Sequence, residues 1–205
     1  MIKKIIFKNI IFNNFDQKNF KKIILKKGLY TFPSGPGIAS IDTSKEYHNS
    51  LKKADLVFFD SGFFVLLLKI LKNINVKKFS GYKFLKLFFI YLKSNKKKIV
   101  FSIDPNRKFS KANKLYLMSL GVKKSYHYLA PKFDSKNVVD KKLLKKIIKA
   151  KPDFIMTNIG GGIQEILGLY LKQNLKFKVT IICTGGAISF FTGDQAPINN
   201  LIDKL

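Results

Sequence analysis

KPDFIMTNIGGGIQEILGLYL, residues 151–171, joins an apolar run to three consecutive glycines and then to a helical pattern. The apolar residues 154–156 are typical of a buried strand, and the glycines 160–162 mark a tight turn that opens a helix. Strand and helix patterns alternate in the same way along the rest of the chain. This alternation predicts a single α/β domain in which helices flank a mostly parallel, Rossmann-like sheet. Within it, residues 1–27 are expected to form a β-ribbon and a helix, and residues 28–205 the α/β core.

Turn residues and helix caps set the expected element boundaries. The strands are expected at residues 3–12 (as the ribbon), 29–32, 54–60, 99–103, 122–129, 153–158 and 178–183. The helices are expected at residues 16–26, 42–53, 63–72, 82–93, 109–120 and 140–150, and from the triple glycine to about residue 174. Asp16 is predicted to cap the first helix, and Asp42 or Thr43 the second. The stretch PSGPG, residues 33–37, is predicted to be a loop.

The formal net charge of +27 points to an anionic partner or to compositional drift. Of 39 basic residues only Arg107 is an arginine, and Lys, Ile, Asn and Phe are abundant, as an AT-rich genome would encode. Attraction to an anionic membrane surface is the second reading. Nucleic-acid binding is disfavoured, because the arginine fork that reads phosphates and bases is nearly absent and no zinc or RNA-binding motif is present.

The sequence shows no signal-peptide pattern and no apolar run of the ~18 residues that span a bilayer. The closest stretch, LVFFDSGFFVLLL at residues 56–68, is split by Asp60. We therefore expect a cytoplasmic protein, peripheral at the inner face of the cytoplasmic membrane. The single cysteine, Cys183, excludes an internal disulfide framework and is interpreted as a small core residue.

Three predicted strand ends carry unusual residues: Thr31 before PSGPG, then Asp60-Ser61-Gly62, then Asn158 before the glycines. In open α/β sheets, ligands bind outside the carboxyl ends of the strands. Asp60 lies between apolar segments, where a carboxylate has a raised pKa and suits a general base. The alternative is that Asp60 only caps the next helix.

The segment IGGGIQE, residues 159–165, is neither a P-loop nor a dinucleotide fingerprint. Its glycines allow backbone N–H groups to approach an anion at a helix N-terminus, and Gln164 has an amide that can read a sugar or a base edge. The alternative is a tight turn without a ligand. No metal site is predicted, because His48 and His127 lie outside any ligand pattern.

Five segments, in order, resemble motifs of the TagA/WecG/CpsF family of bacterial glycosyltransferases, the N-acetylmannosaminyltransferase family. They are ADLVFFDSGFFV (54–65), KKFSGYKFL (77–85), HYLAPKFD (127–134), KPDFIMTNIGGGIQE (151–165) and TGGAISFFTGDQAP (184–197). The resemblance covers roughly residues 28–200. It implies metal-independent, inverting transfer of a sugar, such as N-acetylmannosamine, from a UDP-sugar to a polyprenyl-pyrophosphate-linked acceptor in cell-surface polysaccharide synthesis.

The resemblance also implies residue roles. Asp60 is the expected general base. Expected around the acceptor are Thr31, Ser34, Ser61, Gly62, Gly81, Tyr82 and Pro131. Expected around the nucleotide-sugar are Asn158, Gly160, Gly161, Gly162, Gln164, Glu165, Gly185 and Gly186. No cofactor is expected beyond the UDP-sugar substrate.

The sequence departs from the family pattern at several positions. They are PSGPG after Thr31, the segment 104–107 (DPNR), Gly162-Ile163, Ser189 and Gln195. The family's C-terminal arginines also have no counterpart after Arg107. Lysines or a second subunit of a homo-oligomer would then supply that charge, or the donor differs, or the protein binds a nucleotide-sugar or glycolipid without turnover. A basic nucleic-acid-binding protein is the third reading. Lysines in a ring around Asp60 would favour the enzyme, and one continuous stripe of lysines would favour nucleic acid.

Overall fold

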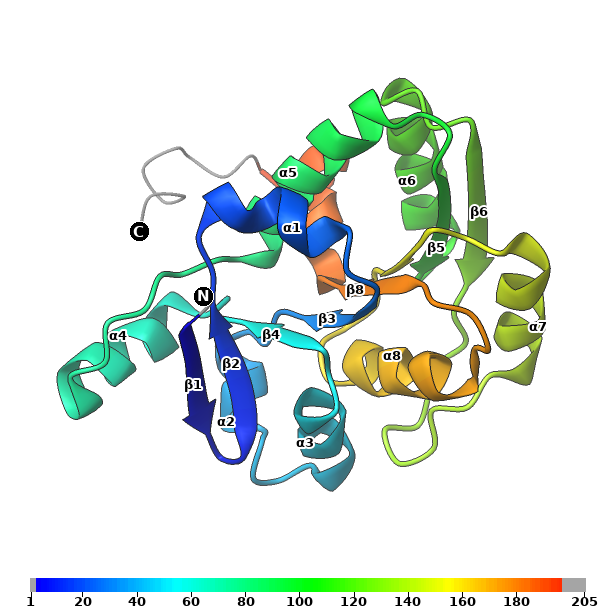
Figure 1. Cartoon of the computed structure of the whole chain (residues 1–205). Helices are drawn as coiled ribbons and strands as arrows, with labels where there is room; N and C mark the ends of the chain where they lie inside the picture. Colours follow the sequence, from blue (N-terminus) through cyan, green and yellow to red (C-terminus); the bar gives the residue numbers. More distant parts are fainter. Residues whose placement is uncertain (1–2, 197–205) are drawn as a thin grey trace.

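The computed structural model describes residues 3–196, which form one mixed sheet with helices on both faces (Figure 1). The strands are β1 (Lys3–Phe7), β2 (Ile10–Asn14), β3 (Gly28–Thr31), β4 (Leu56–Phe58), β5 (Ile99–Asp104), β6 (Lys124–Leu129), β7 (Phe154–Thr157) and β8 (Thr180–Cys183). Their order in the sheet is β1-β2-β4-β3-β8-β7-β5-β6. All neighbours are parallel except β1 and β2. The predicted α/β class with a mostly parallel sheet is confirmed.

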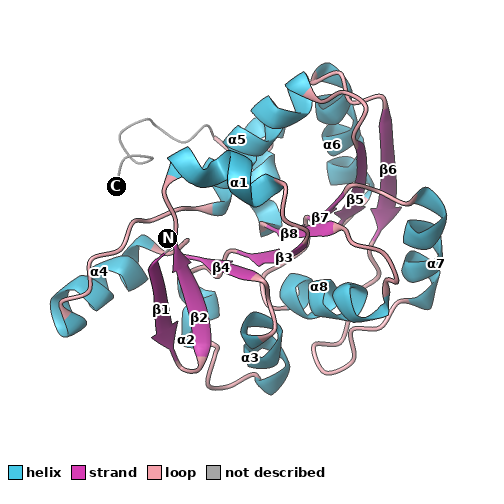
Figure 2. Cartoon of the chain, in the orientation of Figure 1, coloured by secondary structure: helices cyan, strands magenta, loops and turns pink. Residues whose placement is uncertain are grey.

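The helices cover both faces of this sheet, as Figure 2 shows. In chain order they are η1 (Gln17–Asn19), α1 (Phe20–Ile24), α2 (Gly35–Ala39), α3 (Lys45–Lys52), α4 (Gly62–Lys72), α5 (Gly81–Ser94), α6 (Arg107–Ser119), α7 (Lys141–Ala150), α8 (Ile163–Asn174), η2 (Gly185–Ile188) and α9 (Ser189–Thr192). Helices α1, α5 and α6 pack on one face, and α7 and α8 on the other. Within residues 3–196 no helix is long and apolar enough to cross a membrane.

Alternate side chains of the central strands enter opposite cores, because successive residues of a strand point to opposite faces. In β7, Phe154 and Met156 pack with α5, whereas Ile155 packs with α8. In β8, Ile182 lies in the same core as α5, and Ile181 lies in the same core as α8. Both faces are covered, which explains why these strands read as continuous apolar runs in the sequence.

The N-terminal ribbon is a hairpin that belongs to the main sheet. Lys8 and Asn9 turn it with positive φ angles of 48° and 60°, as a two-residue hairpin turn requires. Strand β2 then pairs in parallel with β4, with Phe12 opposite Val57. The predicted ribbon at residues 3–12 is confirmed, although its second strand extends to Asn14.

The prediction that residues 33–37 form a loop is wrong, because α2 begins at Gly35. Ser34 caps this helix by accepting a hydrogen bond from the Gly37 N–H over 3.4 Å. Pro36 lies in the first turn, where a missing N–H costs no hydrogen bond.

The predicted cap of the second long helix is also wrong. Helix α3 begins at Lys45, and its N-cap is Ser44, whose Oγ accepts from the Tyr47 N–H over 3.3 Å. Asp42 instead forms an ion pair with Lys8 of the hairpin turn. A capping residue is set by the geometry of the chain entering the helix, and Ser44 directly follows the two predicted candidates, Asp42 and Thr43.

Candidate active site

A cleft of about 600 Å³ lies at the carboxyl ends of β3, β4, β7 and β8. The parallel strands bring the three predicted strand ends to this one edge of the sheet, as expected. The lining residues come from the loops after these strands, from α2, α3 and α8, and from the loop before α7. They are Phe32, Ser34, Pro36, Gly37, Ser40, Thr43, Ser44, Tyr47, Asp60, Ser135, Gly161, Gly162, Ile163, Gln164, Glu165, Ile166, Thr184, Gly185 and Gly186.

Asp60 follows β4 and lines the cleft, half-buried. Its Oδ1 accepts a hydrogen bond from the Gly81 N–H, at the start of α5, over 2.8 Å. Burial raises the pKa of Asp60, and the Gly81 N–H and the charge of Lys78 offset part of that rise. Asp60 does not cap α4, because Ser61 does so by accepting from the Phe64 N–H. The carboxylate therefore faces the cleft with a raised proton affinity, which a general base needs.

The three glycines leave open space beside the backbone at the start of α8. A Cβ added at Gly160, Gly161 or Gly162 would meet no atom within 4 Å. Gly162 has a φ of +86° and is the N-cap of the helix, a conformation that favours glycine. Its N–H donates to Glu165 Oε2 over 2.7 Å, so this group is already used within the protein. The exposed backbone of Gly160 and Gly161 is what the loop presents to a ligand.

Gln164 joins the glycine loop to the turn after β8. Its Oε1 accepts from the Gly185 N–H over 2.7 Å, and its Nε2 donates to Glu165 Oε1 over 3.0 Å. Gly185 has a φ of +57°, and a Cβ there would lie 3.3 Å from Gln164 Nε2. The side-chain amide of Gln164, which the sequence suggested for sugar or base recognition, thus holds the turn after β8 against the start of α8.

Glu165 is a second carboxylate at the cleft and is almost completely buried, at 1% exposure. Burial raises the pKa of Glu165 to about 7, although Gly162 and Gln164 donate hydrogen bonds to it. The charge of Asp60 contributes to this rise, so the two carboxylates are electrostatically coupled. Tyr47 lies close enough for its pKa to be raised by burial and by the charge of Glu165.

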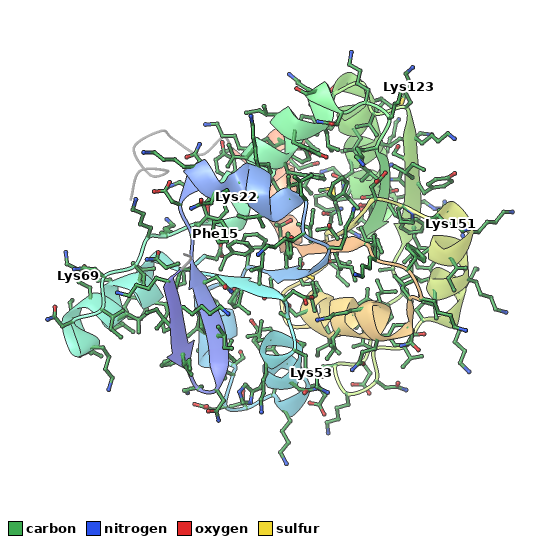
Figure 3. All side chains as sticks on the ribbon, viewed as in Figure 1. Phe15, Lys22, Lys53, Lys69, Lys123 and Lys151 are labelled. Atoms are coloured by element: carbon green, nitrogen blue, oxygen red, sulfur yellow. The ribbon has the colours of Figure 1, made fainter. Side chains whose placement is uncertain are left out.

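Basic side chains are not part of the cleft wall in the described part of the chain. Lys78 lies close to Asp60, since its Nζ is 3.7 Å from the Cβ position of Gly62 and its charge acts on Asp60. In Figure 3 the labelled lysines, among them Lys22, Lys69 and Lys123, project from different elements in different directions. The described cleft wall around Asp60 thus contains no ring of lysines, the arrangement that would have favoured the enzyme.

A smaller cavity of about 200 Å³ adjoins the cleft, with Gly186 in the walls of both. Asn113, Asn158 and Gly160 also border it. The side-chain oxygens of both asparagines are buried without a hydrogen-bond partner, as is Thr184 Oγ1 in the main cleft. Unpaired buried acceptors are rare in native proteins, and the residues that carry these three border the two cavities.

Asp104 fixes the orientation of these two asparagines. Its Oδ1 accepts from Asn113 Nδ2 over 2.7 Å and from Asn158 Nδ2 over 3.0 Å, while Oδ2 lies 3.1 Å from His127 Nδ1. Burial would raise the pKa of Asp104, but hydrogen bonds from His127, Ser102, Asn113 and Asn158 outweigh it and hold the pKa below the usual value. Because both amide nitrogens point to the carboxylate, both amide oxygens point away from it.

The structure brings some of the predicted site residues to the main cleft and leaves others elsewhere. Those in its wall are Ser34, Asp60, Gly161, Gly162, Gln164, Glu165, Gly185 and Gly186. Gly160 and Asn158 border the smaller cavity. Gly81 reaches the site through its hydrogen bond to Asp60, and Gly62 and Ser61 form the start of α4.

Three predicted residues lie away from the cleft wall. Thr31 is fully buried within the sheet, 3.5 Å from the Leu56 carbonyl oxygen. The ring of Tyr82 stacks on Phe191 at 4.9 Å between centroids. Pro131 is exposed in the loop after β6.

Sequence reasoning missed Tyr47, Thr184 and the Asp104 network. Tyr47 lies in a polar helix, KEYHNS, and no local pattern distinguishes it from a core tyrosine. Asp104 had a usable signal, because it ends an apolar strand as Asp60 nearly does. Asn113 is nine residues further along α6 and joins Asp104 only through the tertiary fold.

Comparison with protein families identifies the family of the chain that carries this cleft. The model of the glycosyl transferase WecG/TagA/CpsF family matches residues 7–205, nearly the whole chain. The chain belongs to the WecG/TagA/CpsF family of glycosyltransferases. A comparison with curated proteins finds no match. In this glycosyltransferase no group of three or more His, Cys, Asp or Glu side chains within residues 3–196 is arranged to hold a metal ion.

Proposed function

We propose that this glycosyltransferase moves a sugar, an N-acetylhexosamine such as N-acetylmannosamine, from a UDP-sugar to a polyprenyl-pyrophosphate-linked acceptor. The reaction would serve cell-surface polysaccharide synthesis at the inner face of the cytoplasmic membrane. The observation that carries the proposal is Asp60: a carboxylate of raised pKa that shares one cleft with the open glycine loop. The family supplies the reaction class.

In the proposed step, an acceptor hydroxyl oxygen attacks the anomeric carbon of the donor. Asp60 takes the hydroxyl proton, the bond from the anomeric carbon to the UDP oxygen breaks, and UDP leaves with the electron pair. Attack from the face opposite UDP inverts the anomeric centre. The hydrogen bond from Gly81 holds Oδ1 in place. Proton removal by a positioned carboxylate contributes about 10²- to 10⁴-fold to such a rate, and orientation of the two substrates contributes more.

The nucleotide would lie along the glycine loop. Exposed backbone at Gly160 and Gly161 and the N-terminus of α8 would face the diphosphate, without a metal ion. The unpaired oxygens of Asn113 and Asn158 would accept hydrogen bonds from donors of the nucleoside in the smaller cavity. A site with unpaired buried acceptors discriminates strongly against ligands that lack the matching hydrogen-bond donors.

A thermal-shift titration with UDP, UDP-N-acetylhexosamines and ADP tests the nucleotide site. A ligand at 100 times its Kd that binds only the native state stabilises it by about 2.7 kcal/mol. We expect stabilisation by the UDP compounds and a much smaller effect of ADP. Equal effects of ADP and UDP, or none from any of them, would contradict a UDP-sugar site.

A second candidate is a relative that binds a nucleotide-sugar or a glycolipid without turnover. It is favoured by the lack of lysine and arginine in the described cleft wall, because a departing diphosphate gains charge that such groups usually stabilise. UDP-sugar binding without release of sugar to water or to any lipid-linked acceptor would support it. Transfer catalysed by the purified protein would exclude it.

A further inference from the structure

Helix α4 carries an apolar stripe on its solvent side. Phe63, Leu66, Ile70 and Leu71 are between 50% and 69% exposed, while Phe64 and Leu68 on another side of the helix are buried. Residues 63, 66 and 70 are spaced by three and four positions, so they lie along one face of the helix. Four large apolar side chains exposed together on one element are typical of an interaction surface.

The buried side of α4 is accounted for by the hairpin. Phe64 packs against Phe7 and Phe12, with ring centroids at 4.9 Å and 5.3 Å. In Figure 1, α4 lies beyond β1 and β2 at the left edge of the molecule. The exposed stripe is thus not the hidden side of a packed core helix, and nothing in residues 3–196 covers it.

The charge around this helix identifies the kind of partner. Between Asp60 and Asp104 the sequence contains ten lysines and no acidic residue. On α4 itself Lys69 and Lys72 are exposed, and neither has an acidic partner among the described residues. A second copy of the chain would bring the same positive charge to the contact. An apolar stripe beside unpaired lysines instead complements an anionic lipid surface.

The length of α4 determines how it would meet a bilayer. Its 11 residues span about 16 Å, roughly half the ~30 Å of a hydrocarbon core, so the helix would lie in the interface plane. Lysine side chains can extend from such a helix to the headgroups while their carbon chains stay among apolar groups.

We propose that α4 docks this protein on an anionic membrane, with Phe63, Leu66 and Ile70 inserted at the headgroup boundary. The proposal deepens the proposed function, because α4 begins at Gly62, two residues after Asp60. The side chain of Lys78 lies beside Gly62, and its charge offsets part of the rise in the pKa of Asp60. Docking through α4 holds the mouth of the cleft at the membrane surface, where a lipid-linked acceptor presents its sugar.

Tryptophan fluorescence tests the docking directly, since the sequence contains no tryptophan. Phe63→Trp places a single reporter on the stripe, and Ile148→Trp places one on α7, where Ile148 is 45% exposed. With vesicles of equal parts phosphatidylglycerol and phosphatidylcholine, we expect a blue shift for Phe63→Trp and quenching by brominated acyl chains. Ile148→Trp should show neither. Vesicle binding that leaves the Phe63→Trp emission unchanged, or a blue shift at both positions, would overturn the proposal.

A vesicle co-sedimentation experiment tests the energetic role of the stripe. Phe63→Gln/Leu66→Gln/Ile70→Gln should weaken partitioning at least about tenfold, because three inserted apolar side chains are lost. The control Leu115→Gln/Met118→Gln/Ile148→Gln changes three apolar side chains on α6 and α7 that are 45% to 57% exposed, and it should stay close to wild type. Equal loss in both variants, or unchanged binding of the α4 variant, would overturn the proposal. Two further results would overturn it. One is that wild type binds pure phosphatidylcholine vesicles as tightly as the anionic vesicles, and the other is that α4 binds a partner protein and not vesicles.

These measurements are separable from the proposed chemistry. The UDP titration needs no membrane, so a folded α4 variant that keeps its UDP response isolates the docking surface. If UDP fails to bind while α4 inserts, the proposed function is wrong and the docking surface stands.

Discussion

The backbone N–H of Gly81 donates a hydrogen bond to Oδ1 of Asp60 over 2.8 Å, which links the end of β4 to the start of α5. Twenty-one positions separate the two residues, and α4 projects from the chain between them. The bond fixes one carboxylate oxygen and the rotation of the side chain. In the proposed role of general base, a carboxylate oriented before the substrate binds would lose less entropy on reaching the transition state.

Asp60→Asn is expected to lower the transfer rate by about 10²- to 10⁴-fold, because an amide cannot take the acceptor proton. The amide oxygen can still accept the Gly81 N–H, so the fold and UDP binding should be preserved. Sugar transfer in single-turnover experiments and the UDP thermal shift are the two measurements. A rate within a few-fold of wild type, with the fold intact, would remove Asp60 from the role of base.

Glu165 gives the stability a specific pH dependence. Its pKa rises from 4.5 unfolded to about 7 folded, so the folded state binds the proton more tightly. This contribution is complete below about pH 4.5 and is lost as the pH rises to about 7, on the order of 3 kcal/mol in all. Urea denaturation at several pH values should show wild type losing stability over this range, and Glu165→Gln losing much less. Parallel pH profiles for the two proteins would contradict the prediction.

Gly161→Ala separates ligand approach from folding. A Cβ at this position would meet no atom within 4 Å, and the residue is not in a positive-φ conformation, so stability should be unchanged. If the loop backbone contacts a diphosphate, the added methyl group should weaken UDP binding about tenfold or more, a cost of at least about 1.4 kcal/mol.

Gly162→Ala serves as the matched control for the loop. Its φ of +86° makes any side chain strained, so this variant should lose about 1–2 kcal/mol of stability whether or not UDP is present. Unchanged UDP affinity in Gly161→Ala would place the nucleotide elsewhere in the cleft.

Asp104→Asn is expected to destabilise the protein by about 2–4 kcal/mol, because an amide nitrogen would then face donor groups in a buried site. The lowered pKa of Asp104 adds stability above its unfolded value of 3.8, and this part is lost as the pH falls below that value. The advantage of wild type over the variant should therefore shrink as the pH falls below 3.8. Urea denaturation at neutral and acidic pH checks both statements, and equal stability at neutral pH would refute the network's structural role.

The sheet and the meeting of its strand ends were predictable from the sequence. Apolar runs ending in glycine or a carboxylate identified β4 and β7 together with the turns after them, because parallel strands place such ends at one edge. The start of α2 was not predicted, since Ser34 and Pro36 read as loop residues unless the helix geometry is known. Contacts such as Gln164 to Gly185 and Asn113 to Asp104 could not be predicted from the sequence either. They depend on side-chain directions across separate loops, and local patterns carry no information about those directions.

Strand β3 lies between β4 and β8, and its pairing with β8 joins Gly28 to Thr180. A growing polypeptide makes β3 before β4, β5, β6 and β7, and makes its second neighbour β8 only after all of them. Until β8 arrives, β3 and β7 each have an unpaired edge, and the loop carrying Gly185 is absent from the cleft. Such long-range pairing folds slowly, because the chain must close a large loop first. The cleft of the nascent protein is therefore incomplete until residues 180–186 have been synthesised, and until then the facing edges of β3 and β7 are open to pairing with other strands.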